Sequence, residues 1–133
     1  QDPFSLSGKT ILVTGASSGI GRAIAVHASR RGASLCLTAR NESKLTETLN
    51  LLEPGNHEIL SCDLSIDENI DLLSESVPVL DGILLSSGTI KTVPAAYIKR
   101  ESLEKIFNVN IQGSILLIQR LLRMKKIKHG GSI

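Results

Sequence analysis

The chain has 133 residues, of which 41% are hydrophobic and 21% are charged, so a single globular domain with an apolar core is expected. Its 15 basic and 13 acidic residues leave a formal net charge of +2, which is too small to indicate a nucleic-acid partner. No apolar run has the length of a membrane span, so no membrane partner is expected. Two cysteines in strand-like runs indicate a reducing compartment, and a cytoplasmic location is expected.

The chain opens with a predicted strand at 10–14, a glycine-rich turn at 14–21 and a helix that ends near Arg31. The turn reads Thr-Gly-Ala-Ser-Ser-Gly-Ile-Gly. A strand, a glycine turn and a helix in this order form the context in which such a motif binds a dinucleotide. The candidate cofactor-binding residues of the turn are Gly15, Ser17, Ser18, Gly19, Ile20 and Gly21.

The three glycines of the turn are expected to do different things. Gly15 turns the backbone with a positive φ, Gly19 lets the backbone approach a pyrophosphate, and Gly21 lets the helix pack close to the strand. The unpaired N–H groups and the positive dipole end of the helix then meet the phosphate charge.

The rest of the chain continues the alternation of strands and helices. Strands are predicted at 34–39, 57–62 and 81–87, and helices at 41–52, 65–76 and 102–126. Asn41 is the expected N-cap of the second helix, Ser65 and Glu68 form an expected capping box, and Gly130-Gly131 are expected to end the long helix.

Apolar strands that alternate with helices are typical of a parallel sheet covered on both faces. The predicted fold is therefore α/β, a doubly wound parallel sheet of the Rossmann type whose fifth strand begins at Ser132. Residues 1–133 are expected to form one NAD(P)-binding domain, as the N-terminal part of a longer protein.

Ligands of such folds lie at the carboxyl ends of the strands. Arg40 follows the second predicted strand, where a guanidinium can bind the 2′-phosphate of NADP and a carboxylate would repel it. NADP(H) is therefore favoured over NAD(H). Taken alone, Arg40 fits a solvated charge at the start of a helix equally well.

Two more groups of residues follow strands at this edge. Asp63 can accept a hydrogen bond from an adenine amino group, with Leu64 against the ring, or it can simply serve the helix that follows. Ser86, Ser87 and Gly88 follow the fourth predicted strand and complete the candidate cofactor-binding set.

Together these segments resemble the classical short-chain dehydrogenase/reductase family, and the 3-oxoacyl-carrier-protein reductases in particular. The matching segments are Gly8-Lys9, Thr14–Gly21, Ala39-Arg40-Asn41, Asp63-Leu64 and Phe107–Gly113, within a resemblance that runs from about Leu6 to the last residue. The resemblance implies that Asn110 is the catalytic asparagine, which positions a water in the proton relay. Without it, Asn110 would be a polar residue inside an apolar helix with no assigned role.

The chain departs from the family pattern in two ways. Leu85-Ser86-Ser87-Gly88 stands where the family usually has Asn-Asn-Ala-Gly, and a serine has fewer donors than an amide. The family's chemistry also needs a serine and a Tyr-x-x-x-Lys pair, whereas the only tyrosine, Tyr97, is followed four residues later by Glu101. These 133 residues alone are therefore expected to be inactive.

Two functional hypotheses follow. The favoured one is an oxidoreductase that transfers a hydride between NADP(H) and a small carbonyl or alcohol substrate, with this chain as its cofactor-binding half. The alternative is a non-catalytic nucleotide-binding module or sensor, which is less favoured because a sheet that ends at its fourth strand leaves an apolar edge. By resemblance, the long helix would pack against its counterpart in a homodimer or homotetramer. The three histidines are scattered over unrelated elements, so no metal site is predicted.

Overall fold

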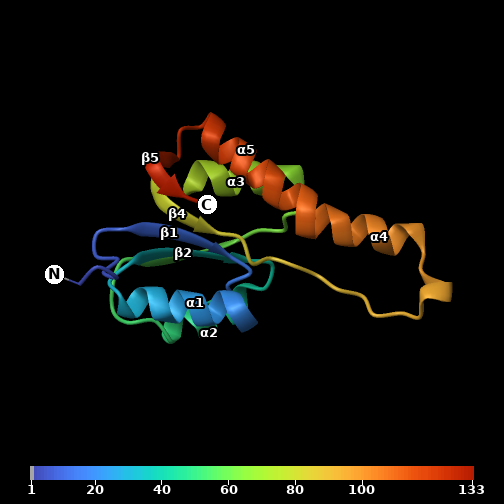
Figure 1. The fold of residues 1–133 in the computed structure, drawn as a ribbon, viewed down its shortest axis with the longest axis horizontal. Coiled ribbons are helices and arrows are strands. Elements are labelled where there is room, and N and C mark those ends of the chain that lie inside the picture. The colour runs from blue at the N-terminus through green and yellow to red at the C-terminus, as the bar shows by residue number, and fades with distance from the viewer. Residues whose placement is uncertain (1) are drawn as a thin grey trace.

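The computed structural model describes residues 2–133, which form one five-stranded parallel sheet with helices on both faces (Figure 1). The strands are β1 (Thr10–Thr14), β2 (Ser34–Ala39), β3 (His57–Ser61), β4 (Leu80–Leu84) and β5 (Ile127–Ser132). The helices are α1 (Gly19–Arg30), α2 (Glu42–Asn50), α3 (Asp67–Ser76), α4 (Arg100–Phe107) and α5 (Ser114–Arg123), with a 3-10 turn η1 (Ala95–Tyr97) and a π-helical segment η2 (Asn108–Gly113). The strand order is β3-β2-β1-β4-β5, which confirms the predicted doubly wound sheet and puts its switch point between β1 and β4.

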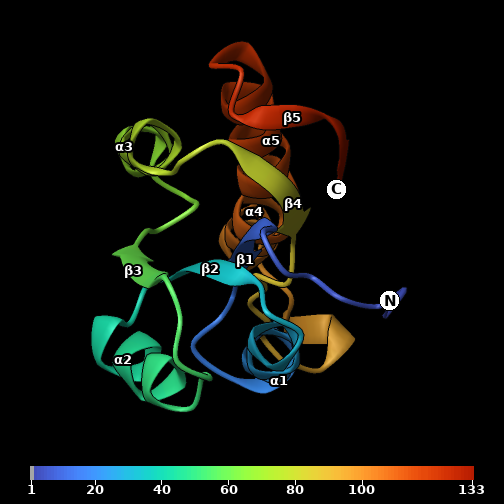
Figure 2. The ribbon, with the colours of Figure 1, turned by 90° about the vertical axis from the view of Figure 1, so that its left-hand side faces the viewer.

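The sheet separates two apolar layers, because neighbouring side chains of a strand point to opposite faces. Leu12 of β1 belongs to the layer that contains Leu117 of α5, together with buried residues of α3. Val13, the next residue, belongs to the layer that contains Ala25 of α1 and Leu45 of α2. Figure 2 shows α1 and α2 on one side of the sheet and α3 and α5 on the other. Since both faces are covered, the central strands β1 and β2 are largely apolar, as the sequence pattern indicated, whereas the edge strand β5 is polar and mostly exposed.

The fourth strand is shorter than predicted. It ends at Leu84, whereas the sequence pattern placed its end at Ser87. The backbone N–H groups of Ser86 and Ser87 donate to the Thr14 hydroxyl, at 3.1 and 3.2 Å. A side chain of β1 therefore satisfies the donors that would otherwise continue the ladder, and the chain leaves the sheet early.

One predicted cap is confirmed and one is wrong. The Asn41 side chain accepts a hydrogen bond from the Lys44 N–H at 3.0 Å and caps α2. The capping box of Ser65 and Glu68 does not form, because α3 begins at Asp67 with Ile66 as its N-cap. The Ser65 hydroxyl instead donates to Asp63 Oδ1 at 2.6 Å, so a neighbouring carboxylate has taken the group that was expected to cap the helix.

The predicted helix at 102–126 is three segments. The π-helical segment η2 separates α4 from α5, and α5 ends at Arg123. Gly113, where η2 passes into α5, is buried against Leu64, so closely that a Cβ on it would lie 2.7 Å from Leu64 Cβ. This contact depends on a loop distant in sequence, which explains why local periodicity predicted one continuous helix.

The end of α5 and the start of β5 also lie earlier than predicted. Lys125 adopts a left-handed φ of 56°, the Lys125 N–H donates to Leu122 O at 3.1 Å, and the Lys126 N–H donates to Leu121 O at 2.8 Å. These two bonds form a Schellman cap with a lysine in the position that glycine usually takes. The helix therefore ends without Gly130-Gly131, which lie inside β5, a strand that begins at Ile127 and pairs irregularly with β4.

Asp81 joins three strands at the amino end of β4. Its carboxylate accepts hydrogen bonds from the Thr10 N–H of β1 at 2.9 Å and from the Lys128 ammonium of β5 at 3.0 Å. The bond from Thr10, followed by the bond from Lys128, lowers the pKa of Asp81. The carboxylate is therefore ionised at neutral pH and holds β5 to the rest of the sheet.

Between β4 and α5 the chain leaves the body of the molecule. The chain runs outward from residue 85 to η1, and α4 brings it back. The segment 88–107 therefore forms an arm, shown in yellow and orange in Figure 1. Over residues 2–133, no helix combines the length and the apolar character that a bilayer crossing requires.

Replacing Gly113 with Ala should lower the free energy of unfolding by about 1–3 kcal/mol, because η2 must move away from Leu64 to admit the methyl group. Gly82→Ala in β4 is the matched control, since its Cβ would meet no atom closer than 3.7 Å and its φ is not positive. The control should change the free energy of unfolding by less than about 0.5 kcal/mol. Chemical denaturation measures both, and equal effects would show that η2 can shift without cost.

Candidate functional site

A cavity of about 1100 Å³ opens at the carboxyl edge of the sheet. It contains every residue assigned to a cofactor from the sequence, namely Gly15, Ser17, Ser18, Gly19, Ile20, Gly21, Arg40, Asp63, Leu64, Ser86, Ser87 and Gly88. The remaining lining residues, which the sequence analysis did not assign to a cofactor, are Ala39, Asn41, Lys44, Cys62, Ile90 and Val109. Asn110, assigned to catalysis, does not line the cavity. The cavity lies at the switch point of the sheet, where open α/β folds bind their ligands.

The glycines of the turn meet three different surroundings. A Cβ on Gly15 would lie 2.8 Å from the Ser87 backbone nitrogen, and a Cβ on Gly21 would lie 2.6 Å from Ser86 Oγ. Gly19 has a positive φ of 53°, yet nothing stands within 4 Å of its Cβ position. Gly15 and Gly21 are therefore required by the protein's own packing, whereas the open side of Gly19 faces free space.

The start of α1 is suited to an anion. Its N-cap residue, Ser18, makes no side-chain capping bond, so that no side chain of the cap satisfies the first N–H groups of the helix. The positive end of the helix dipole lies at the same place. Together with the open side of Gly19, these groups fit a pyrophosphate that lies against the turn.

Thr14 and Ser86 tie the ends of β1 and β4 together. The Ser86 hydroxyl donates to Thr14 O at 2.6 Å, and the Thr14 hydroxyl accepts the N–H groups of Ser86 and Ser87. Thr14 is fully buried. Ser86, which departs from the family's usual asparagine, thus holds the loop after β4 directly to the strand that precedes the glycine turn.

Asn110 fixes the beginning of the arm. Its side-chain oxygen accepts the Thr89 N–H at 2.7 Å, and its side-chain nitrogen donates to Thr89 O at 2.9 Å. This pair of bonds copies the pattern of a strand ladder and holds Thr89, next to Gly88, against η2. Asn110 itself does not line the cavity, but its amide holds Thr89, the neighbour of the lining residue Gly88.

Asp63 serves the loop after β3. Its Oδ1 accepts the backbone N–H of Ser65 at 2.9 Å as well as the Ser65 hydroxyl. Burial would raise the pKa of Asp63, but the hydrogen bonds from Ser65 and the charges of Arg40 and Lys105 outweigh it, so the pKa is lowered. Within residues 2–133 we find no hydrogen bond to Oδ2. The carboxylate thus orders its own loop through one oxygen, and Asp63 also lines the cavity.

Arg22 joins the glycine turn to α2. Its guanidinium donates to Ser17 O at 2.6 Å, to Thr48 Oγ1 at 2.9 Å and to Lys44 O at 3.3 Å. The Thr48 hydroxyl donates in turn to Ala16 O at 2.8 Å. We call this set of bonds the Arg22–Thr48 clamp. The sequence held one signal for it, because a cation in the first turn of a helix is unfavourable and needs a partner.

The two cysteines are not reactive groups of this site. Burial raises the pKa of Cys36 to about 12, with a contribution from Glu58, and it raises the pKa of Cys62 to about 11. Both thiols are therefore protonated at neutral pH and are poor nucleophiles. Within residues 2–133, His, Cys, Asp and Glu side chains do not gather in a group of three that could hold a metal ion.

Comparison with known proteins identifies the family. The model of the short chain dehydrogenase family matches residues 9–133. The chain is 32% identical to a 3-oxoacyl-(acyl-carrier-protein) reductase of Rickettsia felis, over 96% of this chain and 53% of that protein. It is 34% identical to a glucose 1-dehydrogenase of Gluconobacter oxydans, over 92% of this chain and 48% of that protein. The chain thus spans about half the length of the curated relatives it matches.

The fold agrees with solved structures. A structure from Agrobacterium tumefaciens, described as a candidate 2-deoxy-D-gluconate 3-dehydrogenase with bound NADP, superposes with a TM-score of 0.79. It is 27% identical in sequence, and the match covers 92% of this chain and 50% of that one.

Thr48→Val should lower the free energy of unfolding by about 1–3 kcal/mol, because it removes the hydroxyl of the Arg22–Thr48 clamp and leaves buried polar groups unpaired. Thr48 is fully buried. Thr46→Val on the same helix is the control, since Thr46 is exposed and bonds only to Glu42 O in its own helix. Thermal and chemical denaturation compare the two, and a Thr48→Val protein as stable as Thr46→Val would contradict a clamp.

Proposed function

The chain belongs to the short-chain dehydrogenase family, a family of oxidoreductases, and from this we propose that its cavity binds a nicotinamide dinucleotide, with NADP(H) preferred over NAD(H). The observation that carries the proposal is the cavity itself, in which the open side of Gly19 and the start of α1 face the same space as the ends of β2, β3 and β4. That space runs from a site for phosphate to side chains suited to adenine and ribose.

Each group of lining residues has a proposed role. Backbone N–H groups from Ser17 to Ile20 bind the pyrophosphate. Asp63 accepts from the adenine amino group and Leu64 packs on the ring, while Ser86, Ser87 and Gly88 flank the nicotinamide. The nicotinamide supplies the hydride chemistry between the cofactor and a small carbonyl or alcohol substrate. These residues bind and orient the cofactor.

The preference for NADP(H) rests on Arg40. Its backbone is held by a hydrogen bond from the Ser61 hydroxyl to Arg40 O at 3.1 Å, and its exposed guanidinium lines the cavity beside the start of α2. A guanidinium binds a phosphate with two parallel hydrogen bonds. The Agrobacterium tumefaciens neighbour with bound NADP is in line with this preference.

Catalysis needs more than this chain contains. We propose that Asn110 belongs to a proton relay. Its two bonds to Thr89 also fix the wall of the cavity at Gly88. The serine and the Tyr-x-x-x-Lys pair of the family's chemistry are absent from the 133 residues. The proposal therefore assigns cofactor binding to this chain and assigns no turnover to these 133 residues alone.

Isothermal titration with NADPH and NADH tests the cofactor assignment. We expect tighter binding of NADPH, and Arg40→Met should weaken NADPH binding by about tenfold or more while NADH binding changes little, because a charge-assisted bond is lost. Arg30→Met, at the far end of α1, removes the same charge outside the cavity and is the control. Binding of neither dinucleotide to the intact protein would overturn the proposal, and equal binding of both would overturn the NADP preference.

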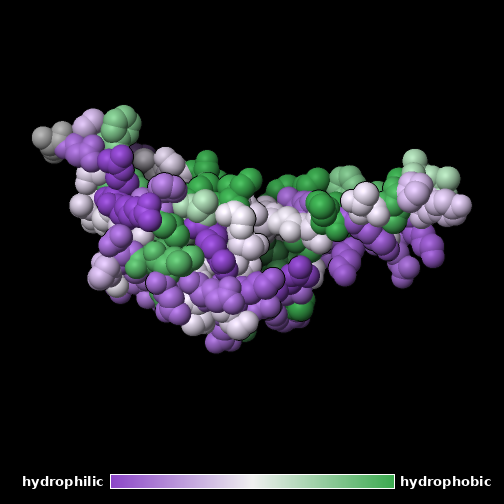
Figure 3. Space-filling view, turned by 90° about the horizontal axis from the view of Figure 1, so that it is seen from below, coloured by the Kyte–Doolittle hydropathy of each residue, from purple (hydrophilic) through white to green (hydrophobic). Residues whose placement is uncertain are grey.

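An exposed apolar stripe runs along α4, η2 and α5. Its members are Leu103, Phe107, Ile111, Ile115 and Leu122, each between 43% and 62% exposed. Figure 3 shows apolar side chains on the arm near its junction with the body. A contiguous apolar surface of this kind is typical of a protein interface. We propose that it packs against a second copy of the chain in a homodimer or homotetramer.

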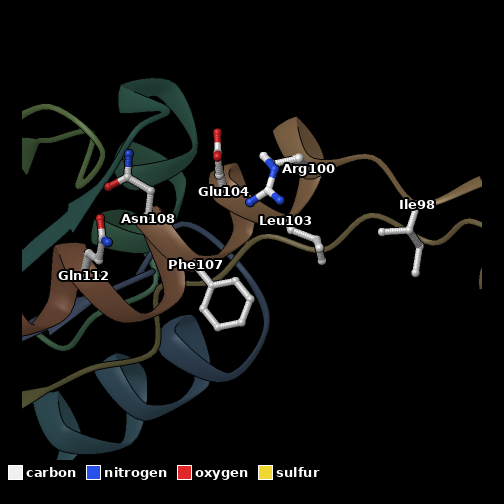
Figure 4. Close-up of a pocket in the computed structure, with 7 residues that line it drawn as sticks. All are labelled: Ile98, Arg100, Leu103, Glu104, Phe107, Asn108 and Gln112. Carbon is white, nitrogen blue, oxygen red and sulfur yellow. The ribbon is translucent and has the colours of Figure 1, made fainter.

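The same region is hollowed. A cavity of about 550 Å³ is lined by Ile98 and by residues of α4 and η2, and in Figure 4 the Phe107 ring points away from Glu104 and Asn108. This cavity contains none of the residues assigned to the cofactor. A partner helix could bury Phe107 here, with the polar side chains at the rim of the contact.

Phe107→Ser should shift the protein toward a smaller species in sedimentation velocity, because it removes a large apolar side chain from the proposed interface. Leu72→Ser is the control, since Leu72 is exposed on α3, away from the stripe. A native protein that sediments as a monomer, or a Phe107→Ser protein that keeps the native assembly, would contradict the proposed interface.

A further inference from the structure

Two cations face the cavity where β2 passes into α2. Arg40 and Lys44 are both exposed and both line the cavity. Within residues 2–133, neither side chain has an ion pair or a hydrogen bond. Because both charges line the same cavity, an anion bound at this end of it would be stabilised by both.

The backbone of Lys44 is fixed from two sides. Its N–H donates to the Asn41 side chain at 3.0 Å, and its carbonyl accepts the Arg22 guanidinium at 3.3 Å. Arg22 is itself bound to Ser17 O in the glycine turn. The base of this lysine is therefore held at a set place relative to the turn that faces a pyrophosphate, although its side chain is long and flexible.

The acidic groups around this pair leave it positive. Glu47 is engaged by Arg22 at 3.2 Å, and Glu42, in the first turn of α2, is exposed and does not line the cavity. Asp63 lines the cavity and is close enough to Arg40 for that charge to lower its pKa, but its Oδ1 is taken by Ser65. The start of α2 adds the positive end of its dipole.

We propose that Lys44 is a specificity-determining residue, the second cation that with Arg40 binds the 2′-phosphate of the dinucleotide. This rests on the proposed function, because it requires that a dinucleotide occupies the cavity with its ribose at the start of α2. A 2′-phosphate carries close to two negative charges at neutral pH. Arg40 contributes a planar pair of donors and Lys44 a compact positive charge in the same cavity. The Arg22–Thr48 clamp holds Lys44 for this role.

The test uses two mononucleotide probes that differ only in the 2′-phosphate. Isothermal titration measures the binding of 2′,5′-ADP and of 5′-AMP to the native protein and to Lys44→Met, Lys44→Arg and Arg40→Met. Lys44→Met should weaken 2′,5′-ADP binding by about tenfold and leave 5′-AMP binding within about twofold, because one charge-assisted contact is lost. Lys44→Arg should retain most of the affinity. Lys99→Met, which removes an exposed charge on the arm, is the control.

Each outcome decides the proposal. A selective loss for 2′,5′-ADP that Lys44→Arg restores supports it. An unchanged affinity in Lys44→Met, with a loss in Arg40→Met, overturns the role of Lys44 and leaves the NADP preference standing. An equal loss for both probes overturns it as well, because Lys44 would then act on the 5′-phosphate. A native protein that binds the two probes equally well removes the proposed NADP preference itself. Thermal unfolding of each variant tests whether it is folded, and only folded variants are compared.

Discussion

The structure depends on a close approach of two backbones at the carboxyl ends of β1 and β4. Gly15 and Gly21 leave no room for a Cβ, and the space they free is filled by the backbone of Ser86 and Ser87 and by the Ser86 hydroxyl. Thr14 then closes the contact, because its hydroxyl and carbonyl both bind the Ser86 segment. Both strands therefore end at a fixed place, and from there the chain enters α1 after β1 and runs outward into the arm after β4 (Figure 1).

That divergence creates the cavity, and charge determines what fits it. The start of α1 supplies N–H groups and a positive dipole end, and Arg40 and Lys44 add two cations at the start of α2. The Arg22–Thr48 clamp keeps these two positive regions at one distance, since it bonds the carbonyls of Ala16 and Ser17 on one side and Lys44 O on the other. A ligand with phosphates at two separate points can contact both positive regions, whereas a ligand with a single phosphate can contact only one of them.

Local patterns predicted the parts of the fold that local interactions determine. The strands at 10–14 and 34–39, the cap at Asn41 and the residues at the strand ends follow from periodicity, side-chain chemistry and strand order. The capping box failed because Asp63, two residues earlier, competes for the Ser65 hydroxyl. The break at η2 depends on Leu64, and the end of α5 depends on a lysine in a conformation that its type rarely adopts. The positions of Arg22 and Lys44 depend on hydrogen bonds between α1 and α2. Because these two helices are apart in the sequence, a local pattern does not predict the contacts.

The π-helical segment η2 links the two ends of the cavity. Near its start Asn110 holds Thr89, next to Gly88, and at its end Gly113 rests on Leu64. Val109, the residue before Asn110, is buried and lines the cavity. The segment η2 thus contacts both the loop after β3 and the loop after β4 and fixes their positions relative to each other. A dinucleotide that spans both loops would therefore depend on η2 for the distance between its two binding regions.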